Sequence, residues 1–376
     1  MKVRLGEYIN EYTLRNKLDE NIPVYSVTNS QGFCRDYFGK EVASKDKKTY
    51  KIVPKGCFAY NPSRINVGSV DWQRDEERVI VSPLYNVFSV SEGLNQQYLY
   101  YYLKSDVALY YIKAVVTGSV RDNLKFSALC DFYINVPEID EQIKIVKRLD
   151  LVNAIIEDNK KKIEKLDELI KARFVEMFGD PLTNPMKWTE STIGDECFYI
   201  KDGPHKSLPD IGKENGGHPF ISVRNIVNGY IDFGTARYIS DKDFAEAIKK
   251  CHPEKGDMLY SKGGTTGIAK LIDIDEEFAN WVHVAVLKFD KTKLNGVFFE
   301  NMLNGAYCYE QSQRLTKGIA NRDLVLSAMA QIRIYRPPIE LQEKFADFVR
   351  QVDKSKLMFQ KLHQKLNILQ QKAGDI

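Results

Sequence analysis

The chain has 376 residues, of which 43% are hydrophobic, and its 54 basic and 51 acidic residues leave a net charge of +3. This length predicts two or three domains, and the charge balance means that any basic surface for nucleic acid must be local. No apolar run reaches the roughly 18 residues that a membrane span needs, and the cysteines include no Cys-x-x-Cys pair of a zinc site. We therefore expect a cytoplasmic protein with no metal site, no cofactor and no contact with a membrane.

The first globular stretch is expected over residues 1–137. Short strand patterns rich in Val, Ile, Tyr and Phe come first and helical patterns follow, which indicates an α+β domain. The expected strands are Val24–Val27, Cys57–Tyr60, Val79–Val81 and Asn86–Val90, and the expected helices are Gln96–Lys104 and Ala108–Val115.

A long helix is expected next, over Ile139–Phe178 within a spacer region of residues 138–180. No Gly or Pro interrupts this stretch, and Gly179-Asp180-Pro181 ends it. At ~1.5 Å per residue the helix would be roughly 60 Å long, which is too long for one small core, so it needs a partner helix. Its apolar seam at 3-4 spacing is expected at Leu149, Val152, Ile156, Asn159, Ile163, Leu166 and Ile170. Asn159 is the polar member of this seam, and it either fixes the register of the helix pair or faces solvent.

A second globular stretch and a second helix complete the chain. The domain is expected at residues 181–336 and the helix at residues 337–376. The expected strands are Phe220–Val223, Asp257–Tyr260 and Val282–Phe289. The helix-pairing positions of the second helix are expected at Val352, Phe359, Leu362 and Leu366.

The two halves of the chain are similar to each other. Leu5-Gly6-Glu7 resembles Ile193-Gly194-Asp195, and from Lys55 onward the offset settles at 200 residues, the spacing between Lys55 and Lys255. Collinear matches of this kind indicate a repeat. We predict an α+β fold with two repeated domains that two long antiparallel coiled-coil helices separate, related by a pseudo-two-fold axis.

Polar loops occur at equivalent places in both halves, and their Asn, Arg, Lys, Ser and Thr side chains are those that contact bases or phosphates. In the first half the loops are Thr28-Asn29-Ser30-Gln31 and residues 61–68. The same residue types also serve ordinary turns, and for a single residue that interpretation is the more common one. The candidate DNA-binding residues are Asn61, Ser63, Arg64, Asn66, Lys201, His205, Arg224, Asn225, Lys262, Thr265 and Thr266.

The motifs of an enzyme are incomplete. Asn61-Pro62-Ser63-Arg64 lacks the second proline and the aromatic residue of an amino-methyltransferase motif, and no Gly-x-Gly loop follows a strand to hold a methyl donor. The glycine-rich loop at residues 262–267 has no Gly-Lys-Ser/Thr ending of a phosphate-binding loop. We therefore expect a binding protein with no catalytic residues.

Several motifs resemble those of specificity subunits of type I restriction–modification systems. They are Phe174-Val175-Glu176-Met177-Phe178-Gly179-Asp180-Pro181, Ile193-Gly194-Asp195, Asp202-Gly203-Pro204-His205 and Pro337-Pro338-Ile339-Glu340-Leu341-Gln342. The resemblance covers essentially the whole chain. The first half departs from it in two ways: Pro137-Glu138-Ile139-Asp140-Glu141-Gln142 replaces the last motif, and the Asp-Gly-Pro-His stretch has no counterpart.

This resemblance implies a non-catalytic subunit whose two target-recognition domains each recognise one half of a split site in double-stranded DNA. It also implies that the long helices set the spacing and dock modification (methyltransferase) subunits, which restriction (ATP-dependent nuclease) subunits join. A two-lobed adaptor that binds proteins is the alternative from another class. A DNA methyltransferase with its own recognition domain is a third, which the missing donor loop disfavours.

Overall fold

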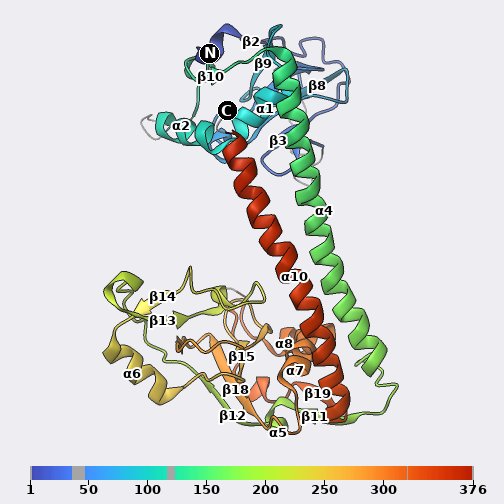
Figure 1. Ribbon diagram of the computed structural model, residues 1–376, viewed down its shortest axis with the longest axis vertical. Helices are drawn as coiled ribbons and strands as arrows, with labels where there is room; N and C mark the ends of the chain where they lie inside the picture. Colours follow the sequence, from blue (N-terminus) through green and yellow to red (C-terminus); the bar gives the residue numbers. More distant parts are fainter. Residues whose placement is uncertain (1, 36–46, 117–122, 320, 375–376) are drawn as a thin grey trace. The chain divides into compact units, whose positions relative to one another are not determined.

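The computed structural model describes residues 2–35, 47–116, 123–319 and 321–374. It divides into two compact units, one formed by Met1–Lys161 with Phe359–Ile376 and the other by Lys162–Met358. Each unit holds one mixed helix-and-strand domain and part of each long helix (Figure 1). Over the described ranges, no helix is both long and apolar enough to cross a membrane.

The first unit is built on a four-stranded antiparallel sheet in the order β2-β9-β6-β7. Three two-stranded ladders accompany it, formed by β1 with β10, β3 with β4, and β5 with β8. The strands are β1 (Lys2–Arg4), β2 (Ile9–Glu11), β3 (Ser26–Thr28), β4 (Gly32–Cys34), β5 (Lys51–Pro54), β6 (Phe58–Tyr60), β7 (Val70–Trp72), β8 (Arg78–Val81), β9 (Asn86–Val90) and β10 (Tyr133–Asn135). The helices of this domain are α1 (Gln96–Lys104), α2 (Asp106–Val116) and α3 (Phe126–Cys130).

The second unit repeats this plan with the sheet β12-β18-β15-β16 and the ladder β11-β19. A further three-stranded sheet, β14-β13-β17, and helix α6 are added to it. The strands are β11 (Thr189–Thr192), β12 (Cys197–Asp202), β13 (His218–Ile221), β14 (Arg237–Ile239), β15 (Met258–Ser261), β16 (Ala269–Leu271), β17 (Ala279–Asn280), β18 (Val284–Phe289) and β19 (Arg333–Arg336). The helices of this domain are α5 (Ile193–Glu196), α6 (Asp241–Lys250), α7 (Gly296–Asn304), α8 (Ala306–Leu315) and α9 (Leu326–Met329).

Helices α1 and α7 occupy equivalent positions in the two repeats and begin in the same way. Each begins after an asparagine, Asn95 or Asn295, whose side-chain oxygen accepts a backbone N–H of the first turn. This is the usual way to satisfy the unpaired donors at a helix start. The sequence prediction of α1 and of strand β9 is confirmed residue for residue, and the other predicted strands are shifted by one to two residues.

The two long helices are α4 (Ile139–Phe178) and α10 (Ile339–Gly374). The predicted range of α4 is therefore confirmed. Within the second unit, Asp167 of α4 pairs with Lys356 of α10 at 2.5 Å. The Phe174 ring lies 5.4 Å from Phe345. Because contacts move forward on α4 as they move backward on α10, the helices are antiparallel there.

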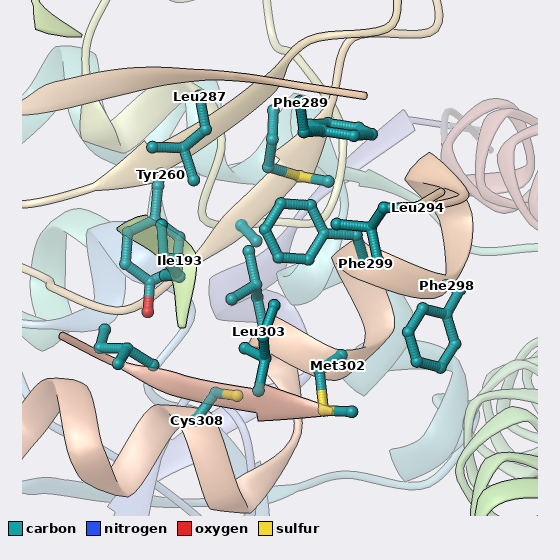
Figure 2. Packing of buried hydrophobic residues seen from close by; sticks show 14 of the residues in the cluster. Ile193, Tyr260, Leu287, Phe289, Leu294, Phe298, Phe299, Met302, Leu303 and Cys308 are labelled. Atoms are coloured by element: carbon teal, nitrogen blue, oxygen red, sulfur yellow. The ribbon is translucent and has the colours of Figure 1, made fainter. Parts of the chain in front are cut away.

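The end of α4 enters the core of the second domain through Phe174 and Phe178. Both rings contact Phe298 of α7, at centroid distances of 5.6 and 4.8 Å. Continued beyond Ile170, the same 3-4 spacing falls on Arg173 and Met177, so the heptad pattern does not identify these two aromatic residues. Figure 2 shows other members of this core, among them Tyr260, Leu287, Phe299 and Leu303, from the sheet and α7.

Most predicted helix-pairing residues lie on inner faces of α4 and α10. Leu149, Ile156, Asn159, Ile170, Val352 and Leu366 are buried, and Val152, Ile163, Leu166 and Phe359 are half-buried. Asn159 is only 2% exposed, which places it inside the seam rather than on the solvent face. Leu362 differs, because it is 41% exposed while the neighbouring His363 is half-buried. A helix with 3.6 residues per turn drifts against a 3.5-residue repeat, which moves the inner position by one residue.

Candidate nucleic-acid interface

Two polar loops of the first unit lie next to each other. The loop at residues 61–68 connects β6 to β7, and a turn at Asn29–Gln31 connects β3 to β4. In the longer loop, Asn61 Oδ1 accepts hydrogen bonds from Ser63 N at 3.1 Å and Ser63 Oγ at 2.9 Å. This is an Asx-type turn, so Asn61 and Ser63 shape the loop from within.

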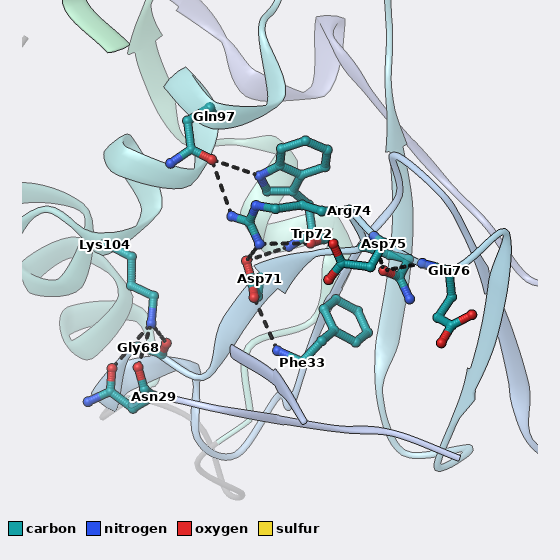
Figure 3. Close-up of polar contacts among 11 residues, drawn as sticks. Asn29, Phe33, Gly68, Asp71, Trp72, Arg74, Asp75, Glu76, Gln97 and Lys104 are labelled. Carbon is teal, nitrogen blue, oxygen red and sulfur yellow. Dashed lines mark hydrogen bonds and ion pairs between the residues drawn. The ribbon is translucent and has the colours of Figure 1, made fainter. Parts of the chain in front are cut away.

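The Lys104 ammonium joins these two loops, as Figure 3 shows. Its Nζ donates to Gly68 O at 2.5 Å, to Asn29 O at 3.1 Å and to Asn29 Oδ1 at 3.2 Å. Burial lowers the pKa of Lys104, an effect that the nearby Asp71 carboxylate opposes. Gly68 has φ +86°, and a Cβ there would lie 2.7 Å from Asn29 Oδ1, so the close approach of the loops requires glycine.

A second group of contacts, around Asp71, fixes strand β4, which follows the Asn29–Gln31 turn. Asp71 accepts hydrogen bonds from Phe33 N at 3.1 Å and Trp72 N at 2.8 Å, and it pairs with Arg74 at 2.8 Å (Figure 3). The Arg74 guanidinium also lies 4.5 Å from the centre of the Trp72 ring. These contacts hold the β3–β4 hairpin against β7.

Most side chains left at the surface of this region are polar, although Val67 is exposed as well. Arg64, Asn29, Ser30 and Gln31 are exposed, and Asn66 is half-buried. Among the described residues, the structure gives the Arg64 guanidinium no hydrogen bond or ion pair. Arg64 is therefore available for a guanine edge or a phosphate, whereas Asn61 and Ser63 are engaged within their loop.

The corresponding loop of the second unit, residues 261–267, is more buried. Lys262 is 6% exposed, and its Nζ lies 3.0 Å from Asp323 Oδ1 and 3.6 Å from Asp202 Oδ2. The Thr266 and Thr316 hydroxyl oxygens lie 2.9 Å apart, whereas Thr265 is exposed. A contact between Lys262 and DNA would require its ammonium to leave two carboxylates.

Asp202 gathers three of the basic side chains of the second unit. Besides Lys262, its carboxylate pairs with Lys250 at 3.0 Å and with His205 at 3.6 Å. The adjacent Gly203 is required, because a Cβ at this position would lie 1.7 Å from Asn280 O. The Asp-Gly-Pro-His motif thus places His205 at the surface near Lys262, while the exposed Lys201 lies over the Tyr199 ring at 5.1 Å.

Arg224 and Asn225 have different surroundings although they are neighbours. Asn225 is 1% exposed, and its Oδ1 accepts hydrogen bonds from Ser222 N and Oγ at 2.9 and 2.8 Å. Its Nδ2 donates to Asp232 O at 3.1 Å, so its amide is engaged in the fold. Arg224 is exposed and donates to Thr235 O at 2.6 Å.

Sequence reasoning missed Lys104, Asp323 and Arg237. Arg237 is half-buried with its guanidinium 5.8 Å from the Trp281 ring, and Lys104 and Asp323 hold the loops described above. Lys104 could have been identified from the repeat, because the matching position 304 in the second half is also polar and also ends a helix. The DNA contacts of all eleven candidate residues remain predictions.

Comparison with known proteins places this fold in a family. The model of the type I restriction modification DNA specificity domain matches residues 3–168 and again residues 185–370. The chain is 25% identical over 315 residues to the type I restriction enzyme MjaIX specificity subunit of Methanocaldococcus jannaschii. That alignment covers 80% of this chain and 71% of its relative.

Solved structures share the fold at low sequence identity. One is described as showing complex assembly and conformational transition of the type I R-M system; it has a TM-score of 0.60 and 18% identity, over 100% of this chain and 96% of that one. The S subunit of a type I restriction-modification system from M. genitalium has a TM-score of 0.54 and 14% identity, over 100% and 94%. With most of its length matched by two copies of one family model, this chain belongs to the family of type I restriction-modification DNA specificity subunits.

Proposed function

We propose that this chain recognises a bipartite site in double-stranded DNA, with one half-site for each repeated domain. The observation that carries the proposal is the repeat itself: two domains with the same sheet order each place a polar loop after the equivalent strand, β6 or β15. In the first of these domains, Arg64 is exposed on the loop that Lys104 joins to the Asn29–Gln31 turn. Exposed Arg, Asn, Gln and Ser side chains are the groups that distinguish base pairs in the major groove.

The proposed target-recognition domains are residues 1–137 and 181–336, and the spacer helices are residues 138–180 and 337–376. The relatives are subunits of type I restriction enzymes, so the partners we propose are modification subunits and restriction subunits. The long helices α4 and α10 would set the half-site spacing and dock the modification subunits. In this assembly the adenine methyltransferase and the ATP-dependent endonuclease belong to the partners, and this chain is non-catalytic.

A base-resolution footprint tests the proposal directly. The full chain, bound to duplexes selected from a random library, should protect two short clusters of base pairs that an unprotected spacer of constant length separates. Recovery of no common sequence, together with capture of other proteins by both domains, would favour the adaptor alternative. A methyl-donor binding assay on the isolated chain separates the third alternative, because a specificity subunit should bind no donor.

A further inference from the structure

The last residue of helix α1, Lys104, fixes the end of the loop at residues 61–68. Its ammonium donates to Gly68 O at 2.5 Å, and the same group reaches Asn29 O and Oδ1 at 3.1 and 3.2 Å. One side chain from a helix thus bonds to both the loop and the Asn29–Gln31 turn.

The same position in the second repeat has the same task and a different side chain. Asn304, the last residue of α7, accepts a hydrogen bond from Ala269 N at 2.9 Å and donates one to Ala269 O at 3.0 Å. Ala269 begins β16, one residue beyond the polar loop at residues 261–267. Both repeats therefore bond the end of this loop to the last residue of the first domain helix that follows it, α1 or α7, although the two side chains, lysine and asparagine, differ in charge and length.

The contacts of Lys104 indicate that its ammonium stabilises the loops and is not left available to bind a phosphate. A lysine ammonium has three N–H donors, and the three acceptor atoms on Gly68 and Asn29 match that number. The Tyr100 ring and the Asp71 carboxylate also lie nearby, with Nζ 5.7 Å from the ring centre. All three acceptors belong to loops, so the ammonium acts on loop geometry.

We propose that Lys104 and Asn304 are positioning residues for DNA specificity, each setting the loop geometry of its own domain and thereby the base preference of one half-site. This inference rests on the proposed function, since it assumes that the loops recognise DNA. Recognition of base edges needs donors and acceptors within about 3 Å and in line. A loop that is released from its helix loses this alignment without losing its side chains.

The test compares variants of the full chain in selection from a random duplex library. Lys104→Met removes the ammonium and keeps an unbranched side chain, while Lys104→Arg keeps a cation that can reach the same carbonyls. Gly68→Ala perturbs the same junction from the loop side, since its Cβ would meet Asn29 Oδ1. Asn304→Leu is the counterpart in the second domain. Lys147→Met is the charge control, because Lys147 is an exposed lysine of α4 in the first unit.

We expect Lys104→Met and Gly68→Ala to reduce discrimination about 10-fold at base pairs of one half-site, in the range of a single mismatch. Asn304→Leu should do the same in the other half-site only. Lys104→Arg should restore most of the preference, and Lys147→Met should leave the selected motif unchanged.

Three outcomes would overturn the inference. One is a Lys104→Met chain that selects the wild-type motif, and another is Lys104→Met and Asn304→Leu variants that alter the same half-site. The third is an unchanged motif with a salt slope lowered by about one, which would make Lys104 a phosphate contact. If the wild-type chain selects no motif at all, the proposed function fails instead, so the two failures are distinct.

Discussion

The Gln142 side chain, at the start of α4, accepts a hydrogen bond from the backbone N–H of Asn95 at 2.8 Å. Its amide nitrogen, Nε2, donates to Gly93 O at 2.7 Å and to Pro137 O at 2.8 Å. In the second unit Gln342 Oε1 accepts from Asn295 N at 2.8 Å, and its Nε2 donates to the carbonyl of Pro337 at 2.7 Å. Each glutamine thus links the start of a long helix to the asparagine that caps a domain helix, and both side chains are fully buried.

Replacing either glutamine should destabilise its own unit. Gln142→Leu leaves the Asn95 N–H and two carbonyls without their partner in a buried place, which should lower the free energy of unfolding by about 1–3 kcal/mol. Urea unfolding of the full chain measures the loss. Gln342→Leu should give a similar loss. Gln142→Glu keeps the acceptor but turns an ionised oxygen toward the Gly93 and Pro137 carbonyls, so at neutral pH it should lose at least as much as Gln142→Leu. A Glu variant as stable as the wild type would contradict this account.

The two repeats differ at one place beside the core, which gives a reciprocal prediction. Tyr307 and Tyr335 stack at a centroid distance of 5.5 Å in the second unit. At the matching positions of the first unit, Val107 and Asn135 line a surface pocket of about 450 Å³, which the exposed Tyr111 and Tyr133 also line. Val107→Tyr should therefore raise the stability by about 0.5–2 kcal/mol. Tyr307→Val should lower it by about 2–4 kcal/mol.

Thermal unfolding of both variants checks this prediction. A Val107→Tyr chain that melts below the wild type would mean that the pocket is too narrow for a ring and that the variant is overpacked. Val107→Thr serves as the control, because it changes the residue without filling the pocket.

The buried Asn159 should lower stability as the polar member of the α4 seam. Among the described residues its Nδ2 has no hydrogen-bond partner, and a buried unpaired donor is unfavourable. Asn159→Leu should therefore raise the melting temperature, as expected for a residue that is kept for register rather than stability. An unchanged or lower melting temperature would contradict this role, and Glu157→Gln on the exposed face is the control.

Arg64 and Lys262 occupy equivalent loops but should respond differently to substitution. Arg64 is exposed, and if it contacts a base edge, Arg64→Ala should weaken binding by about 1–3 kcal/mol and relax one position of one half-site. Lys262 lies between two carboxylates, so Lys262→Met should chiefly lower stability by leaving Asp202 with fewer partners. Binding isotherms at several salt concentrations separate the two cases. A salt slope reduced by about one, with normal stability, would instead make Lys262 a phosphate contact.

Periodicity and repetition made much of the fold predictable. The range of α4 followed from an uninterrupted heptad pattern with a Gly-Asp-Pro end, and α1 followed from a helical pattern that begins after Asn95. The contacts of Phe174 and Phe178 did not follow, because the inner face of a long helix drifts and tertiary packing decides which residue points inward. The shifted strand ends reflect the same dependence on neighbours.

The candidate interface was predictable only at the level of loops. The sequence located the loops at residues 61–68 and 261–267, because polar residues follow equivalent strands in both halves. It did not reveal that Lys262 and Asn225 are buried and bonded to other residues of the fold. The residue type of a lysine or asparagine in a turn does not show whether its side chain faces a carboxylate or solvent. That distinction depends on Asp323 and Asp232, and Asp323 lies far away along the chain.

The most direct test of the account exchanges one domain. Residues 181–336 are replaced by the matching domain of a relative with a different DNA motif, and methylated adenines are sequenced in cells that carry the complete system. We predict a motif in which one half and the spacing are unchanged and the other half becomes that of the relative. A motif in which both halves change together would contradict independent recognition by two repeated domains.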